Sequence, residues 1–279
     1  MLIDTHLSKK PGIYGRKIFF LYPGFALNTN IILRLREQEF ELYKLEEYRK
    51  LKCLLEKYPD SIVLINLDSQ NSINVWFNFI KYFEQSPKFS HVSFGVFTDK
   101  IREADEERYT KALKLEAGFY SLSKTFGEIM DCLMIKLEEL KAKGCRQFLS
   151  MNCAEDKGSE CYFVSGNMMY KMKLLDISSI GLGMKVPGKY VQVMKPDSVI
   201  RGLTLVLGTK QLKVNARIHA TRPEEDGVYA LLIFTPETPD NFRNFVRNYI
   251  YEEIQQRLGA ECLSLEWDKN EYVIAPPEE

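Results

Sequence analysis

Three residues between two predicted strands have the types and spacing of a binding turn. Asp176, Ser178 and Gly181 form the pattern Asp-x-Ser-x-x-Gly, which leaves one apolar run and enters the next. A carboxylate accepts hydrogen bonds, and a hydroxyl both accepts and donates them, so the pair can bind a polar ligand. The same residues also suit a tight turn, in which Asp176 and Ser178 bond their own backbone and Gly181 supplies a positive φ.

Arg146 lies in the segment that leads into these strands. A guanidinium is planar and always charged, so it can stack on a base and form paired hydrogen bonds with base acceptors or phosphate oxygens. The residue four positions later is Ser150, so no second arginine follows at this spacing. The alternative interpretation of Arg146 is an ordinary solvated linker arginine.

The first half of the chain alternates short apolar runs with amphipathic helical patterns. The predicted strands are Lys17–Tyr22, Phe40–Leu45, Ile62–Ile65, Val92–Phe97 and Phe119–Leu122. The run Ile62–Ile65 has no polar alternation, as in a parallel strand that is buried on both faces. Five such βα units predict a doubly wound, five-stranded parallel sheet with its ligand site at the carboxyl ends of the strands.

The second half changes to strand after strand, separated by Gly, Pro and Asn. The predicted strands are Cys161–Val164, Met168–Leu175, Gly183–Val186, Tyr190–Val193, Ile200–Leu207, Leu212–His219 and Val228–Phe234, with a helix at Thr235–Leu258. These seven short patterns, from which we expect about six paired antiparallel strands, predict a small six-stranded antiparallel β-barrel with a C-terminal helix. We therefore divide the chain into an N-terminal tail (1–16), an α/β domain (17–142) and a barrel domain (143–279).

Composition excludes several classes of function. The chain of 279 residues has 38 Lys+Arg and 38 Asp+Glu, so bulk charge attracts neither nucleic acid nor anionic membrane. No apolar run approaches the roughly 18 residues of a membrane span. The six cysteines form no C-x-x-C pair, and no phosphate loop or nucleophile elbow is present. We expect a cytoplasmic, non-enzymatic protein with reduced thiols, no metal site, no membrane insertion and no nucleic-acid partner.

Residues 17–142 resemble the receiver domain of response regulators, on the segment Leu122-Ser123-Lys124-Thr125-Phe126 above all. The resemblance makes Lys124 the receiver lysine, Thr98 the hydroxyl that couples phosphorylation to conformation, and Asn66 the residue in place of the phosphoaccepting aspartate. An amide cannot form an acyl phosphate, and Tyr22-Pro23-Gly24 offers no carboxylate where receivers bind Mg²⁺. We therefore expect a pseudo-receiver without a Mg²⁺ site, which acts as a docking or dimerisation surface. A flavodoxin-like fold with the same period is the alternative.

The pattern Asp176–Gly181 resembles the D/N-x-S-x-x-G signature of PilZ domains, and the order of strands and final helix agrees with that family over residues 143–258. The resemblance implies a receptor for cyclic di-GMP, with Arg146, Asp176, Ser178 and Gly181 as binding residues. PilZ domains that bind this nucleotide carry R-x-x-x-R, of which Arg146 alone remains. Loss of one bidentate contact costs about 1–3 kcal/mol. Lysines nearby can compensate only as point charges: Lys143, Lys171 and Lys173.

Three functional hypotheses follow from these resemblances. In the first, the PilZ-like domain binds cyclic di-GMP and the pseudo-receiver relays that event to an unknown protein partner. In the second, both domains have lost their ligands and the chain is a scaffold or adaptor. In the third, Asp68, two residues beyond Asn66, is phosphorylated, although its alternative role is that of a turn residue. We favour the first hypothesis because all three residues of the D/N-x-S-x-x-G signature, Asp176, Ser178 and Gly181, are present.

Overall fold

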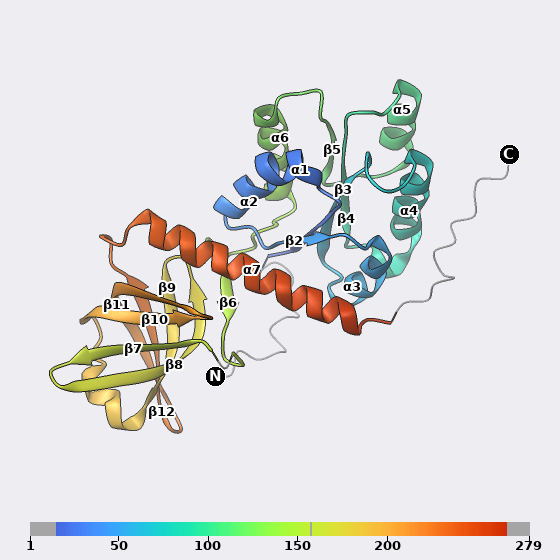
Figure 1. Cartoon of the computed structure of the whole chain (residues 1–279). Helices are drawn as coiled ribbons and strands as arrows, with labels where there is room; N and C mark the ends of the chain where they lie inside the picture. The colour runs from blue at the N-terminus through green and yellow to red at the C-terminus, as the bar shows by residue number, and fades with distance from the viewer. Residues whose placement is uncertain (1–14, 157, 267–279) are drawn as a thin grey trace. The chain divides into compact units, whose positions relative to one another are not determined.

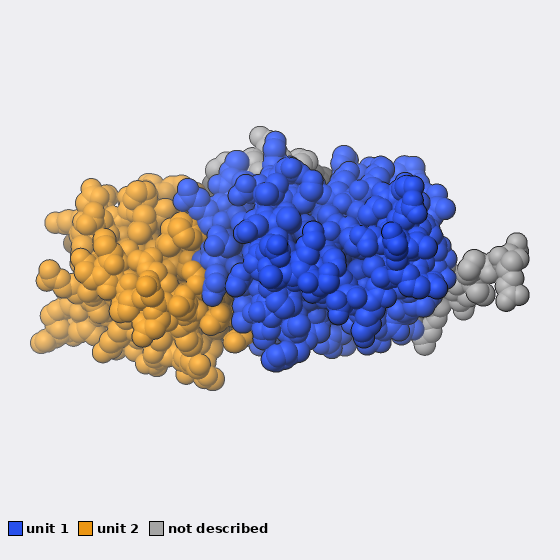
Figure 2. Space-filling model, turned by 90° about the horizontal axis from the view of Figure 1, so that it is seen from above, with its two compact units in different colours: residues 1–147, 255–279 blue, residues 148–254 orange. Residues whose placement is uncertain are grey.

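The computed structural model describes residues 15–156 and 158–266. By its internal contacts the chain forms two compact units, one of residues 1–147 and 255–279 and one of residues 148–254 (Figure 2). The predicted fold class, a parallel α/β sheet followed by an antiparallel barrel with a C-terminal helix, is confirmed. Within the described ranges, no helix is long and apolar enough to cross a membrane.

The α/β unit is built on five parallel strands in the order β2-β1-β3-β4-β5. They are β1 (Lys17–Leu21), β2 (Leu42–Leu45), β3 (Ser61–Asn66), β4 (Ser93–Thr98) and β5 (Gly118–Ser121). Every residue of β3 and β4 is buried, as expected for apolar strands covered on both faces. From β1 the chain adds β2 on one side, and it then adds β3, β4 and β5 on the other side. The strand order therefore reverses at β1, and the loops after β1 and β3 lead to opposite faces of the sheet.

Helices cover both faces of this sheet (Figure 1). One face carries the consecutive segments α1 (Gly24–Leu27), the π-helical η2 (Asn28–Ile32) and α2 (Leu33–Glu37), together with α6 (Phe126–Glu139). The other carries η3 (Tyr48–Lys50), α3 (Leu51–Lys57), α4 (Ile73–Gln85), η4 (Pro87–Phe89) and α5 (Glu103–Ala112). Thr125 begins α6 with a capping box, because its hydroxyl accepts from the Glu128 N–H and the Glu128 carboxylate accepts from the Thr125 N–H.

The second unit is a closed barrel. Its strands are β6 (Ser150–Asn152), β7 (Glu160–Ser165), β8 (Met168–Ser178), β9 (Gly181–Pro187), β10 (Val199–Leu207), β11 (Lys210–Glu224) and β12 (Gly227–Phe234). Six of them close a ring in the order β8-β7-β10-β11-β12-β9, because β8 also pairs with β9, and β6 adds to β8 outside the ring. The ring leaves no long unpaired edge.

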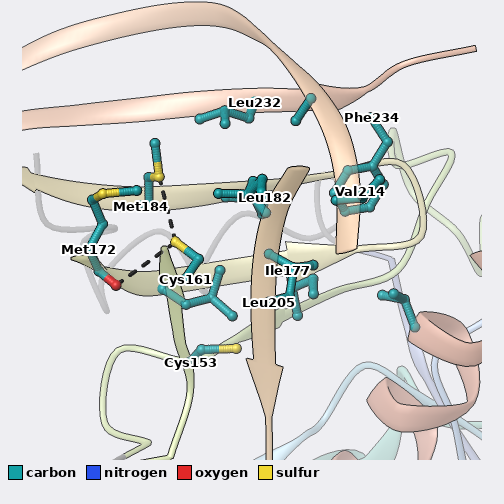
Figure 3. Close-up of a cluster of buried hydrophobic side chains, with 14 of the residues drawn as sticks. Cys153, Cys161, Met172, Ile177, Leu182, Met184, Leu205, Val214, Leu232 and Phe234 are labelled. Atoms are coloured by element: carbon teal, nitrogen blue, oxygen red, sulfur yellow. Dashed lines mark hydrogen bonds between the residues drawn. The ribbon is translucent and has the colours of Figure 1, made fainter. Parts of the chain in front are cut away.

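Aliphatic and sulfur-containing side chains fill the barrel (Figure 3). The Cys161 thiol lies 3.6 Å from the Met184 sulfur and 3.9 Å from the Met172 carbonyl oxygen. Burial raises the pKa of Cys161 to about 12, so this thiol stays protonated and behaves as a small apolar side chain.

One local prediction in the barrel is wrong, and one strand was missed. Tyr190–Val193 is not a strand but part of the 3-10 helix η5 (Gly188–Val193), in which the Tyr190 ring packs edge-on against Tyr170 at 5.1 Å. Tyr190 packs against the barrel core from this turn, so the segment carries apolar residues that resemble a strand in the sequence. Strand β6 was not predicted, because three residues are too few to show a period.

Helix α7 (Asp240–Ser264) begins after Pro239, five residues later than predicted. Its first half packs on the barrel core through Phe242, Val246, Ile250 and Tyr251. Its last turns belong to the α/β unit, where the Gln255 amide accepts from the Lys44 N–H at 2.8 Å and donates to the Lys44 carbonyl at 2.9 Å. These two bonds satisfy the backbone of edge strand β2 as a neighbouring strand would.

Candidate functional site

The residues Asp176, Ser178 and Gly181 come together where β8 turns into β9. An irregularity in β8 between Leu174 and Asp176 lets Ile177 point into the barrel core, so Asp176 and Ser178 lie on its outer face. Ser178 is paired with Gly181 across the two strands, and its hydroxyl donates to the Gly181 carbonyl at 3.1 Å. The predicted side-chain-to-backbone bond of this turn is therefore present.

The glycines of β9 are required by close approach. Gly181 does not have a positive φ, so the expectation that it supplies one is wrong. A Cβ at Gly181 would lie 2.2 Å from the carbonyl oxygen of Leu232 on β12. A Cβ at Gly183 would lie 2.2 Å from Oδ2 of Asp176 and 2.4 Å from the hydroxyl oxygen of Tyr229. Gly183 thus leaves the space that the Asp176 carboxylate and the Tyr229 hydroxyl occupy.

Tyr229 of β12 is part of this site, and the sequence analysis missed it. Its hydroxyl donates to Oδ2 of Asp176 at 3.1 Å. Burial raises the pKa of Asp176 even though Tyr229 and the backbone of Gly183 donate to it, and burial together with Asp176 raises the pKa of Tyr229 to about 12. The alternation of β12, in which Val228 and Ala230 are buried, is the signal that places Tyr229 on the outer face.

Strand β6 brings two further polar residues to the same face. Ser150 pairs with Ser178, and Asn152 pairs with Asp176. Ser150 is exposed, and it stands four residues after Arg146, where the pattern R-x-x-x-R has its second arginine. We call this surface the β6–β8–β9 face and define it by Ser150, Asn152, Asp176, Ser178, Gly181, Gly183 and Tyr229. Position 150 is therefore an exposed position directly beside Ser178.

Arg146 is not a solvated linker residue. It belongs to the α/β unit, where its guanidinium donates to Oε2 of Glu41 at 3.1 Å and its side chain is 26% exposed. Of the lysines proposed to compensate for the missing arginine, Lys171 is paired with Glu160 at 2.6 Å. The structure thus brings Asp176, Ser178 and Gly181 together on the barrel. Arg146 instead pairs with Glu41 within the α/β unit.

The predicted degenerate receiver site lies at the carboxyl ends of β3 and β4. Asn66 is buried, and its amide nitrogen donates to the Tyr22 carbonyl at 3.0 Å and to the Ser69 hydroxyl at 2.9 Å. Its amide oxygen accepts from the Asp68 N–H at 3.2 Å. Asn66 therefore ties the loops after β1 and β3 together with hydrogen bonds that a carboxylate could not donate.

Asp68 is the partner of Thr98. The Thr98 hydroxyl donates to Oδ1 of Asp68 at 2.8 Å, and the Asp99 N–H donates to Oδ2 at 2.7 Å. Lys124 is exposed in the loop between β5 and α6, directly before the N-cap Thr125. Within the described part of the chain, no three His, Cys, Asp or Glu side chains are grouped to hold a metal ion.

A polar cleft of about 410 Å³ opens at this edge of the sheet. Residues after β1 and β3 and from the end of β2 line it: Tyr22, Pro23, Gly24, Asn28, Lys44, Glu46, Ser69 and Gln70. It lies where the strand order reverses, the position at which ligands bind in open α/β sheets. The turn Tyr22-Pro23-Gly24 gives this cleft a hydroxyl and backbone groups but no acidic pair.

We expect acetyl phosphate treatment to add no phosphoryl group to the chain. Both carboxylate oxygens of Asp68 already accept hydrogen bonds, and the turn after β1 has no carboxylate for the Mg²⁺ that the transfer requires. Intact-mass spectrometry checks this. A stoichiometric gain of one phosphoryl group that disappears in Asp68→Asn would contradict it.

No protein-family model matches the chain, and no curated protein matches its sequence. Solved structures that resemble part of it include the PilZ domain of YcgR from Escherichia coli with c-di-GMP, at 13% identity and a TM-score of 0.35, which covers 42% of this chain and 97% of that one. The K. pneumonia MrkH–c-di-GMP complex matches at 17% identity, with a TM-score of 0.31 and coverages of 42% and 54%. Bacillus subtilis MotI/DgrA, an inhibitor of motility, matches at 13% identity with a TM-score of 0.32, over 40% of this chain and 53% of that one. The match thus spans about half of the last two chains.

Proposed function

We propose that this chain is a non-enzymatic signalling effector whose barrel is a PilZ-type domain that binds cyclic di-GMP. Its α/β unit is then a receiver-like domain that cannot be phosphorylated and that relays the binding event to a protein partner. The observation that carries the proposal is the β6–β8–β9 face, on which Asp176, Ser178 and Gly181 meet at one turn and β6 adds Ser150 beside Ser178.

The chemistry of this face suits a guanine base. An ionised Asp176 accepts hydrogen bonds, and guanine presents N–H donors on one edge and the acceptors N7 and O6 on another. Tyr229 occupies Oδ2 of Asp176 and orients the carboxylate. Arg146 would supply the charged donors for guanine acceptors or phosphate oxygens, which no residue of the β6–β8–β9 face carries.

The contacts of the α/β unit support a relay that needs no phosphoryl group. The Thr98 hydroxyl, which the receiver resemblance makes the sensor of phosphorylation, is held by the Asp68 carboxylate. Asn66 holds the loops after β1 and β3 together. The unit therefore keeps a fixed surface at the carboxyl ends of its strands, as a docking domain requires.

The scaffold function is the second candidate. Two observations favour it, namely that Ser150 stands at the position of the second arginine and that Arg146 is paired with Glu41. A chain of this kind would bind partners through both units without a nucleotide.

Calorimetric titration of cyclic di-GMP into the full-length chain separates the two functions. We expect saturable binding by the native chain and loss of binding in the Arg146→Ala/Asp176→Ala double variant. No heat with the native chain up to high micromolar nucleotide would reject the receptor function and leave the scaffold function.

Ser150→Arg is expected to tighten cyclic di-GMP binding about tenfold to a hundredfold, because it adds one bidentate, charge-assisted contact. Position 150 pairs with Ser178 and is exposed, so the longer side chain has room to reach a ligand beside the motif. Titration of the native chain and the variant measures the change. Ser165→Arg, at the exposed end of β7, adds the same charge elsewhere on the barrel. Equal effects of the two variants would contradict a specific contact at position 150.

A further inference from the structure

Glu41 is a carboxylate at the centre of a charged network in the α/β unit. It directly precedes β2, and its side chain is 15% exposed. Oε1 accepts from the Lys17 ammonium and from the Tyr43 hydroxyl, the latter at 2.6 Å. Oε2 accepts from the Arg146 guanidinium at 3.1 Å. The two oxygens therefore have separate partners, and Arg146 is bound to one of them.

The charge of this carboxylate is fixed. Burial alone raises the pKa of Glu41, but Lys17, Tyr43 and Arg146 together lower it to about 2. Lys17 is itself held in place, since its ammonium lies 5.0 Å from the centre of the Tyr43 ring and 4.8 Å from that of Tyr58. Glu41 thus remains an anion throughout the physiological pH range and stays paired through Oε1 if Arg146 leaves.

A carboxylate and a phosphate are chemically similar partners for a guanidinium. Each presents a pair of anionic oxygens that accept charge-assisted hydrogen bonds from the same N–H groups. One N–H donor of Arg146 that is bonded to Glu41 cannot at the same time donate at full strength to a nucleotide.

We propose that Glu41 lowers the affinity of this chain for cyclic di-GMP, because its carboxylate accepts from the Arg146 guanidinium and so competes with the nucleotide for that group. The inference rests on the proposed nucleotide-binding function. It adds a specific affinity-determining residue that lies outside the barrel and outside both predicted motifs. Since Lys17 and Tyr43 retain Glu41, exchange of Arg146 between Glu41 and the nucleotide leaves no bare carboxylate in the α/β unit.

Glu41→Gln is the direct test. The amide keeps the shape of the side chain and can still accept from Lys17 and Tyr43, but it loses the charge that holds Arg146. We expect cyclic di-GMP to bind the full-length variant about tenfold more tightly than the native chain, as for removal of one competing charge-assisted bond. Glu41→Asp, which keeps the charge beside Lys17 and withdraws it from Arg146, is a second variant with the same expected direction. Thermal unfolding confirms that each variant is folded.

Two controls isolate the contact. Asp60→Asn removes the carboxylate partner of another arginine in the same unit, since Oδ1 of Asp60 lies 2.8 Å from Nε of Arg16, and it should leave the affinity unchanged. In an Arg146→Ala background, Glu41→Gln should also have no effect, because the competing contact no longer exists.

The outcomes separate this inference from the proposed function. Tighter binding by Glu41→Gln than by the native chain, with no such difference in the Arg146→Ala background, supports the inference. Equal affinities of the native chain and Glu41→Gln, with binding intact, overturn the inference and leave the receptor function standing. Absence of binding in the native chain and in every variant overturns both.

Discussion

Asp176→Ala is expected to weaken binding of cyclic di-GMP about a hundredfold. This is the effect of losing an ionised acceptor that would form two hydrogen bonds with the nucleotide. Asp176 is the charged acceptor of the β6–β8–β9 face, and Tyr229 fixes its orientation. Calorimetric titration of the full-length chain measures the loss. Asp68→Ala is a matched control, since Asp68 likewise accepts from a hydroxyl, that of Thr98, but lies in the α/β unit. Equal losses in both variants would contradict a specific role for Asp176.

The same carboxylate predicts how the affinity depends on pH. Burial raises the pKa of Asp176, so the group takes up its proton at a higher pH than an exposed aspartate. The protonated form accepts poorly from guanine N–H groups, so affinity should fall as the pH is lowered through this raised pKa. Titrations at a series of pH values test this, and an identical pH profile in Asp176→Asn would contradict it.

Arg16→Met is expected to lower the free energy of unfolding of the α/β unit by about 3 kcal/mol, as removal of a buried charge with several hydrogen bonds does. The Arg16 guanidinium is 8% exposed and donates to the carbonyls of Ser61 at 3.0 Å and His91 at 2.7 Å and to the Ser93 hydroxyl at 3.0 Å. Its loss would remove three hydrogen bonds that join the start of β1 to the segments at the starts of β3 and β4. Because Asp60 is partly exposed, its ion pair with Arg16 adds little.

Urea unfolding followed by the fluorescence of Trp76, which is buried in the α/β unit, measures this change. Arg49→Met is the control, because the Arg49–Glu47 pair is on the surface and its removal should change stability by less than about 0.5 kcal/mol. Similar midpoints for Arg16→Met and Arg49→Met would contradict the structural role of Arg16.

The fold was predictable because each unit has its own hydrophobic pattern: strands alternate with helices in the first, and strand follows strand in the second. The apolar run Ile62–Ile65 became the wholly buried β3, and the turn at Gly166 joins β7 and β8 as the alternation around it indicates. Prediction from hydrophobic periodicity was wrong where a short segment packs through a single side chain. The segment of Tyr190 is helical and packs its ring against the barrel core, although its apolar residues resemble a strand in the sequence.

The site was predictable only as far as its residues are close in sequence. Asp176, Ser178 and Gly181 share one turn, whereas Tyr229 and Ser150 reach the same face through pairing of distant strands. Sequence spacing cannot show that Glu41 pairs with Arg146, 105 positions away.

Arg16 is a similar case, since it lies in the segment predicted as a tail. Its partners Ser61, His91 and Ser93 are supplied by segments far along the chain. Only the parallel pairing of β1 with β3 and of β3 with β4 brings these residues to one place.

The most direct test of the central claim is a titration of the isotopically labelled full-length chain with cyclic di-GMP, followed by amide chemical shifts. The account predicts saturable shifts concentrated at Asp176–Gly183 and at Ser150–Asn152, because these backbones form the β6–β8–β9 face. Arg146 should shift with the same midpoint. An unchanged spectrum at high micromolar nucleotide, or shifts confined to residues of the α/β unit away from Arg146, would contradict it.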